Sequence, residues 1–374
     1  MHFSLEKQDA NSSARAGLLT TGHGVVPTPI FMPVGTLGTV KGLHQRELLQ
    51  DLDAPIILAN TYHLYLRPGV NTLRSVGGLH AFMGWPRALL TDSGGYQVHS
   101  LAHQRRISEA GVEFRSHLDG SKHLLTPEKA IDIQRAIGAD IVMAFDECTP
   151  DGCSYAYAKD SMERTHRWLW RCQQQMARTQ AQALHEQSLF PIVQGSIYKE
   201  LRVQATEHIA SQPAAGYAIG GVCHPTGHLY EVTGWVCERL PRERPRYLMG
   251  VGTPQDLLEC IALGVDMFDC VMPSRNARNG TLFTTKGMVN MRNSRWAGSL
   301  EPVDAGLQGY ASRCYSKGYL HHLVRCGERL GAQIATLQNL SLYLWLVRSA
   351  RAHILQGTFT GWKAQVLPRL MRKL

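Results

Sequence analysis

Short apolar runs rich in β-branched residues recur along this chain of 374 residues. Amphipathic stretches of helical length separate them, as at 126–138 and 157–180. Strands that alternate with helices form a mostly parallel sheet covered by the helices. Eight such runs favour a (β/α)8 TIM barrel over an open sheet. The expected strands are 30–34, 55–60, 88–92, 140–145, 189–194, 216–220, 246–250 and 266–270.

Three of these runs reach an aspartate at their end: Asp92 closes 88–92, Asp146 directly follows 140–145, and Asp269 is the next-to-last residue of 266–270. A carboxylate at the end of a buried strand does not serve packing, because burying it without a partner is costly. On successive parallel strands the three carboxylates would converge at one rim, where α/β proteins keep their active sites. The pattern therefore predicts an enzyme.

The regular alternation weakens after residue 279, where turns and basic residues interrupt the pattern. We expect one barrel domain over residues 1–374, with an inserted subdomain at about 279–340. Hydrophobic residues make up 44% of the chain and charged residues 18%, as in ordinary globular proteins.

Several features bear on location. The chain has no apolar run of about 18 residues, which a membrane span requires. The first residues lack the charged-then-apolar order of a signal peptide. None of the nine cysteines forms a C-x-x-C pair. We expect a cytoplasmic protein with no membrane segment and no disulfide framework.

Basic residues outnumber acidic ones, giving a formal net charge of +9. Solubility alone would account for such a charge, and so would an electrostatic surface for nucleic acid. Aromatic residues are interleaved with the basic ones in the last third of the chain, which favours nucleic acid.

The strand ends carry long motifs that resemble one known family. These motifs are PTPIFMPVGT, NTYHLYLRPG, TDSGGYQV, IVMAFDECTP, YLMGVGTP and MFDCVMPSRNARNG. In these stretches, which are spread over nearly the whole chain, the sequence is similar to bacterial tRNA-guanine transglycosylases. The resemblance implies exchange of guanine at the anticodon wobble position of tRNA for a 7-deazaguanine, preQ1 or queuine. It also implies a homodimer.

The resemblance assigns the catalytic pair. Asp269 matches the family's nucleophile, which attacks C1′ of the ribose and holds the RNA as a covalent ester. Asp92 matches the general acid/base that handles the proton of the departing and incoming bases. From the motif alone, Asp92 would equally suit a turn-capping role before Ser-Gly-Gly.

The resemblance also assigns recognition residues. Tyr96 and Met249 would stack on the base, although both residue types also pack readily in a core. Arg275 and Arg278 would contact tRNA phosphates, although simple solvated charges are an alternative. The implied base-binding set is Asp146, Gln194, Gly221, Ser93, Tyr96, Met249 and Val222.

One departure from the family concerns zinc. Family members usually carry a structural zinc site, C-x-C-x-x-C followed by a histidine. Aligned on YSKGYLHHL and TLQNL, this chain has Leu307, Gly309, Ser312 and Gln338 at the four ligand positions. These residues do not supply the Cys and His ligands that such zinc sites use. We therefore expect a zinc-free protein. In the absence of any nucleotide-binding or redox motif, we also expect no cofactor.

A second departure lies in the loop at 220–230. It is shorter than in the family and lacks a characteristic glutamate, with Cys223 and His224 in its place. Base preference therefore does not follow from the resemblance. His99 and Thr281 also replace common family residues, and nothing in the sequence assigns them a role.

Three functions remain open at this level. The first is an active tRNA transglycosylase, which retention of both catalytic aspartates favours. The second is a paralogue that modifies DNA with a deazaguanine. The third is a non-catalytic RNA-binding subunit that partners an active homologue.

Overall fold

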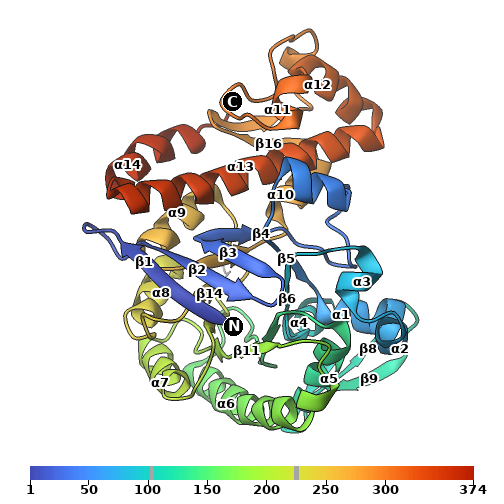
Figure 1. Ribbon diagram of the computed structural model, residues 1–374, viewed down its shortest axis with the longest axis vertical. Helices are drawn as coiled ribbons and strands as arrows, with labels where there is room; N and C mark the ends of the chain where they lie inside the picture. The colour runs from blue at the N-terminus through green and yellow to red at the C-terminus, as the bar shows by residue number, and fades with distance from the viewer. Residues whose placement is uncertain (102–104, 223–226) are drawn as a thin grey trace.

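The computed structural model describes residues 1–101, 105–222 and 227–374, without the side chains of 99–101. It is a mixed α/β structure in which parallel strands are surrounded by helices (Figure 1). Seven of the eight strands expected from the sequence are present as single strands shorter than their apolar runs, whereas the run at 189–194 is divided into two strands. The parallel strands are β4 (Ile30–Met32), β5 (Ile56–Ala59), β6 (Ala88–Thr91), β10 (Ile141–Met143), β11 (Ser188–Phe190), β12 (Ile192–Val193), β13 (Tyr217–Ile219), β14 (Arg246–Leu248) and β15 (Met267–Asp269).

These strands form two parallel sheets, in the orders β11-β10-β6-β5 and β12-β13-β14-β15-β4. One residue, Pro191, separates β11 from β12, because proline has no N–H for the ladder. Its carbonyl still accepts a hydrogen bond from Ala218 N at 2.9 Å. At the other edges, an isolated parallel bridge pairs Val34, just after β4, with Leu58 of β5. The two sheets are therefore joined at both pairs of edges. The chain itself connects β11 to β12 through Pro191, and the Val34–Leu58 bridge connects the β4 and β5 edges.

Three small antiparallel sheets complete the strands. They are β1 (His2–Gln8) with β2 (Arg15–Thr21) and β3 (Gly24–Thr28), β7 (Arg105–Ile107) with β8 (Val112–Arg115) and β9 (Lys122–Leu125), and β16 (Thr281–Thr284) with β17 (Gly287–Asn290).

The helices begin and end where the sequence provides caps. The helix expected at 126–138 forms as α5 (Pro127–Ile137): the Thr126 hydroxyl accepts a hydrogen bond from Lys129 N, and Gly138 ends the helix in the left-handed region. The helix expected at 157–180 begins slightly earlier, as α6 (Tyr155–Arg178), after the cap at Ser154. The other helices are α1 (Thr61–Leu64), α2 (Val70–Ser75), α3 (Leu79–Met83), α4 (Gly95–Leu101), α7 (Lys199–Ala210), α8 (Leu229–Cys237), α9 (Pro254–Ala262), α10 (Met272–Arg278), α11 (Tyr310–Cys314), α12 (Lys317–Cys326), α13 (Arg329–Gln356) and α14 (Phe359–Leu370).

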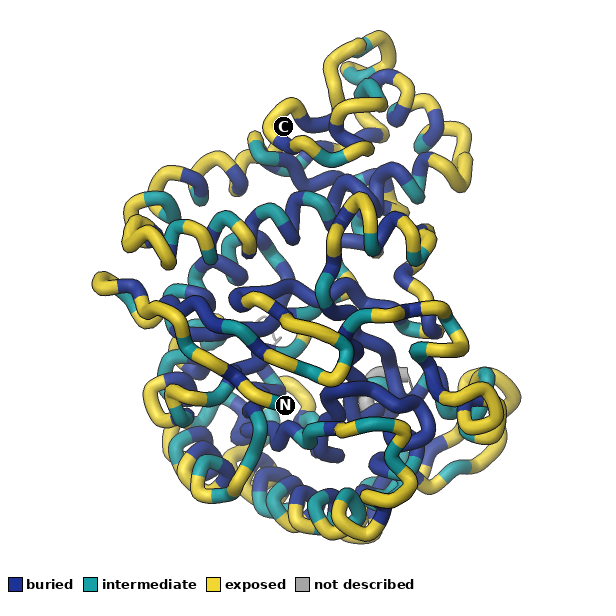
Figure 2. The backbone as a smooth tube through the Cα atoms, in the orientation of Figure 1, coloured by how far each residue is buried: buried dark blue, intermediate teal, exposed yellow. Residues whose placement is uncertain are grey.

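Helix α13 lies between the parallel sheets and the outer unit of β16, β17, α11 and α12 (Figure 1). It packs against α10, β16 and β4, and most of its residues up to 350 are buried. It runs without a break through residue 340, where the sequence suggested a boundary. The parallel strands are buried almost throughout, and exposure concentrates on the outer helices (Figure 2). Within the described ranges, no helix is long and apolar enough to cross a bilayer.

Candidate active site

Three aspartates lie at the carboxyl ends of parallel strands. Asp92 follows β6 directly, Asp146 lies just beyond β10, and Asp269 is the last residue of β15. Strands β6 and β10 are neighbours, but β15 belongs to the other sheet, so the expectation of three successive strands is wrong for Asp269. The charge of Asp269 nevertheless acts on Asp92, raising the pKa of that carboxyl beyond the effect of burial. The two catalytic candidates are therefore close enough to interact.

Asp92 is buried, and its carboxylate accepts hydrogen bonds on both oxygens. Thr61 N donates to Oδ1 at 2.9 Å, Gln97 Nε2 donates to Oδ2 at 2.7 Å, and Asn60 Nδ2 also donates to Oδ2. Burial raises the pKa of Asp92 to about 6 although these hydrogen bonds lower it. A carboxyl with this pKa exchanges a proton readily near neutral pH, as a general acid/base must.

Asp269 has one occupied and one open oxygen. Tyr247 Oη donates to Oδ1 at 2.6 Å and Gly250 N donates to the same atom at 2.8 Å. Within the described part of the chain, Oδ2 accepts no hydrogen bond. Burial raises the pKa of Asp269, and its two hydrogen bonds oppose that effect. The carboxylate is fixed through Oδ1 while Oδ2 keeps its lone pairs for an incoming group.

Asp146 and Gln194 form a buried pair. Gln194 Nε2 donates to Asp146 Oδ2 at 2.7 Å, and Ser93 Oγ donates to Oδ1 at 3.0 Å. Gln194 Oε1 is buried with no partner among the described residues. Gly221 lies at φ +64°, and a Cβ there would come within 2.5 Å of Gln194 Oε1. The pair presents oxygen acceptors that suit a ligand carrying N–H donors.

The other expected base-binding residues lie near these strand ends. Met249 is half-buried directly after β14, and Val222 is buried next to the undescribed residues 223–226. Tyr96 lies on α4 and is 56% exposed, so it is not a core residue. Cys223, His224 and the His99 side chain lie outside the described residues.

Arg275 and Arg278 lie on α10, six and nine residues after Asp269 in the sequence, and both are exposed. Burial of part of the side chain, and then the charge of Arg275, lower the pKa of Arg278. Thr281 begins β16, where its carbonyl accepts a hydrogen bond from Asn339 Nδ2 at 3.0 Å. This contact is made by the backbone, so it does not depend on the residue type at position 281.

The structure adds a residue that the sequence analysis missed. Arg202 of α7 is fully buried, and its guanidinium donates to the carbonyls of Val193 (2.9 Å), Ser196 (2.7 Å) and Gly221 (3.1 Å). Burial lowers the pKa of Arg202 to about 9. It joins the loops after β12 and β13, which carry Gln194 and Gly221. The sequence feature that could have revealed Arg202 is an arginine among the apolar residues that α7 buries.

Replacing Arg202 with leucine should destabilise the protein. Three carbonyls would lose a buried donor, and each unpaired group costs about 1–3 kcal/mol unless water replaces it. We expect the free energy of unfolding to fall by about 3 kcal/mol or more in urea denaturation. The control is Arg178→Leu at the exposed end of α6. Equal stability of the two variants would contradict the positioning role.

The four positions aligned with family zinc ligands do not fit zinc. Leu307 is buried and apolar, and Gly309 has no side chain. The Ser312 hydroxyl donates to Gln338 Oε1 at 2.6 Å, and both residues are buried. A direct hydrogen bond thus connects two positions that a metal would otherwise link, and the set contains none of the usual zinc-binding groups.

A mixed α/β fold with three carboxylates at its strand ends, one of them buried with its pKa raised to about 6, is typical of an enzyme and has the groups that glycosyl transfer requires. Comparison with known proteins agrees. A family model described as "Queuine tRNA-ribosyltransferase" matches residues 9–371, and the chain belongs to this family.

Curated relatives match over nearly their whole length. The queuine tRNA-ribosyltransferase of Desulforudis audaxviator is 50% identical over 367 residues, 98% of this chain and 97% of the relative. That of Symbiobacterium thermophilum is 49% identical over 371 residues, 99% of this chain and 91% of the relative. That of Thermoanaerobacter sp. is 48% identical over 365 residues, 97% and 96% respectively.

Proposed function

We propose that this chain is a tRNA-guanine transglycosylase that exchanges guanine at the anticodon wobble position for a 7-deazaguanine, preQ1 or queuine. Membership of the queuine tRNA-ribosyltransferase family supports the activity. The observation that carries the mechanism is Asp269, fixed through Oδ1 with Oδ2 open beside a proton-exchanging Asp92.

In the first half-reaction, Asp269 Oδ2 attacks C1′ of the ribose. The bond from C1′ to N9 of guanine breaks, and the electron pair leaves with the base. Protonated Asp92 supplies a proton to the departing guanine. The RNA is then held as an ester of Asp269.

The second half-reaction reverses these steps. The incoming deazaguanine attacks C1′ through its N9, loses the N9 proton to Asp92, and displaces Asp269. The acid/base group is returned to its protonated state, so no net proton is consumed. A pKa of about 6 allows Asp92 to serve in both directions.

Base recognition follows from the acceptor pair. Asp146 accepts hydrogen bonds from N1–H and the exocyclic amine of guanine, while Gln194, Gly221 and Ser93 complete the pocket. Adenine lacks these donors, so the buried acceptors would be left unpaired at a cost of about 1–3 kcal/mol each. The base stacks between Tyr96 and Met249, with Val222 at the pocket wall.

Positive charges on the protein bind the substrate RNA. Arg275 and Arg278 are exposed beside the nucleophile and contact phosphates, which position the RNA without reading its sequence. The target base leaves its stack to enter the pocket, as in other base-modifying enzymes. The formal charge of +9 attracts the polyanion.

We further propose that the two parallel sheets close into one (β/α)8 barrel, and that 279–340 is a subdomain with its inner boundary inside α13. Continuity at Pro191 and the Val34–Leu58 bridge support closure. Homodimerisation remains a prediction from the family.

The proposed activity is tested by incubating the protein with radiolabelled guanine and either unfractionated tRNA or duplex DNA. Label should enter tRNA alone and be chased out by unlabelled preQ1 or queuine. Label in DNA alone would indicate the paralogue function. No label in either, while a known transglycosylase labels the same tRNA, would indicate a non-catalytic subunit.

We also infer that the subdomain folds without zinc, stabilised instead by the Ser312–Gln338 hydrogen bond and by Leu307. Hydrogen–deuterium exchange of α11 and the first half of α13 should be the same in EDTA and in equimolar zinc. Faster exchange in EDTA, confined to these helices, would contradict the inference. Gln338→Leu should accelerate exchange there in both conditions, because Ser312 loses its partner.

A further inference from the structure

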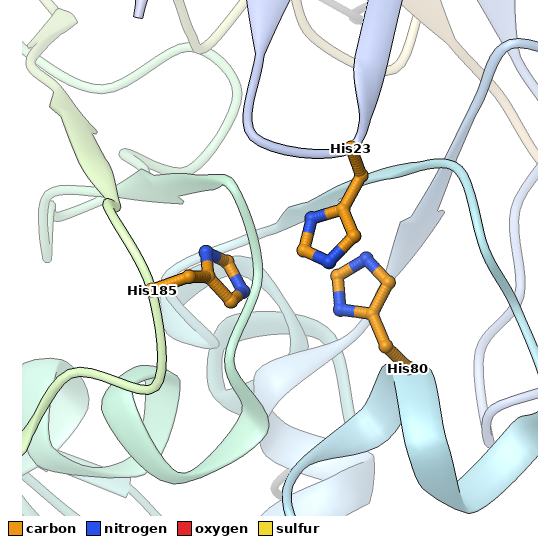
Figure 3. A group of neighbouring side chains, drawn as sticks. All are labelled: His23, His80 and His185. Carbon is orange, nitrogen blue, oxygen red and sulfur yellow. The ribbon is translucent and has the colours of Figure 1, made fainter.

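A second cluster of polar side chains lies at the opposite ends of the strands that carry Asp92 and Asp146. His23 lies in the turn between β2 and β3, His80 in α3, and His185 in the segment before β11 (Figure 3). One ring nitrogen of each histidine lies within 4.8 Å of the other two. In the described ranges, no other group of three His, Cys, Asp or Glu side chains is close enough to share a metal ion.

Each of the three rings has one nitrogen held by an oxygen at the edge of the cluster. Such an oxygen can accept the N–H of a neutral imidazole, and we place the ring hydrogen on the nitrogen that faces it. The contacts are His23 Nδ1 to Asp140 Oδ1 (2.8 Å), His80 Nε2 to Arg87 O (3.0 Å) and His185 Nδ1 to Glu186 O (3.0 Å).

With the hydrogens on those nitrogens, the second nitrogen of each ring presents a lone pair. His80 Nδ1 and His185 Nε2 then both face the carbonyl oxygen of Gly138, at 3.1 and 2.9 Å. Within the described residues, His23 Nε2 has no hydrogen-bond partner. A neutral ring can donate to only one of the two carbonyl oxygens that face it, so His80 and His185 each leave one contact unsatisfied, which either a second ring proton or a bound cation would relieve.

We propose that His23, His80 and His185 bind a divalent transition-metal ion, with Asp140 as the carboxylate that orients His23. Imidazole nitrogens suit Zn²⁺, Cu²⁺ and Ni²⁺. A carboxylate that accepts the far N–H of a ligating histidine is the usual support for such a site.

Forming the site requires the His23 ring to turn as well as to move closer. It stacks on the His80 ring at present, with centroids 3.8 Å apart and planes 14° from parallel, so the two in-plane lone pairs do not yet point at one ion. Zinc–nitrogen bonds of about 2.0–2.1 Å in tetrahedral geometry place ligand nitrogens roughly 3.3 Å apart. The present separations of up to 4.8 Å must therefore shrink by about 1.5 Å at most. His23 can supply this movement, because its side chain is 26% exposed on a hairpin turn.

The proposed ion is structural rather than catalytic. Asp140 precedes β10 and Asp146 follows it, so at about 3.3 Å per residue the two ends lie roughly 20 Å apart. The ion would join the β1-β2-β3 sheet to the segments before β6 and β11. It is independent of the transglycosylase proposal, and it restricts the expectation of a zinc-free protein to the subdomain at 279–340.

The test uses the full chain without an affinity tag, stripped with EDTA and dialysed. Equilibrium dialysis should find one Zn²⁺ per chain, and Co²⁺ should give the visible absorption of a low-symmetry site. His23→Ala and His185→Gln should each lower zinc affinity at least about 10- to 100-fold, the range for loss of a supporting partner alone. Zinc should raise the melting temperature of the wild type and not that of the double variant, which carries both His23→Ala and His185→Gln.

The control is His208→Ala, which removes an exposed histidine stacked on His166 at 4.1 Å, outside the cluster. It should bind zinc like the wild type, and guanine exchange should be unchanged in every variant. Absence of zinc binding by the wild type would overturn the proposal. So would wild-type affinity in the double variant, since the ion would then lie elsewhere. If His23→Ala fails to fold by circular dichroism, His185→Gln alone decides.

Discussion

Asp269→Asn should abolish guanine exchange, lowering the rate by at least about 10⁴-fold, as loss of a covalent nucleophile does. The amide oxygen can still accept from Tyr247 and Gly250, so the local structure is kept. The amide nitrogen replaces the open Oδ2 and has no lone pair to attack C1′. The chemistry is therefore lost while the fold is retained.

Two measurements test this expectation. Initial rates of labelled guanine exchange give the loss of activity, and a denaturing gel with tRNA and a deazaguanine shows the covalent complex. Only the wild type and the control Asp51→Asn, an exposed residue ahead of β5, should give the gel-stable band. A band of normal intensity in Asp269→Asn would assign the nucleophile to another residue.

Asp92→Asn should have opposite effects on activity and stability. An amide cannot exchange the proton of the base, so exchange should fall by about 10²–10⁴-fold, the usual contribution of general acid/base catalysis. At pH 8 the variant should be more stable than the wild type by about 1–3 kcal/mol, because burying the charge of Asp92 is costly and the side-chain amides of Asn60 and Gln97 can turn to present their oxygens to the new amide nitrogen.

The pH dependence of this difference follows from the raised pKa. The folded protein holds the Asp92 proton up to about pH 6, whereas the unfolded chain loses it near the ordinary aspartate pKa of 3.8. The stability of the wild type relative to the variant should therefore increase as the pH falls from about 6 to 4. Urea denaturation of both proteins at pH 8 and pH 4.5 measures the change. A difference that is constant with pH would show that Asp92 does not titrate in this range.

The strand pattern was predictable because it depends on local sequence. Runs such as 88–92 and 140–145 are mostly apolar and reach an aspartate at the end, Asp92 within the first run and Asp146 directly after the second, so their boundaries are encoded within a few positions. The start of α5 was equally local, since Thr126 and Pro127 both favour a helix N-terminus. Strand order was less accessible: Asp269 lies on a strand that is not next to those of Asp92 and Asp146.

The residues of the candidate site were likewise only partly predictable from the sequence. The resemblance of the motifs to one family named Asp92, Asp146, Gln194 and Asp269. The supporting residues were not found, because Arg202 acts on backbone carbonyls that carry no sequence signal.

The sequence by itself determined the elements, the family and the candidate catalytic carboxylates, because these depend on residue type and local spacing. The tertiary structure decided which oxygen of Asp269 is open, how high the pKa of Asp92 lies, and that Ser312 meets Gln338. It also decided that His23, His80 and His185 meet. Burial and hydrogen bonding between segments far apart in the chain set these properties, and such contacts exist only once the strands and helices have packed.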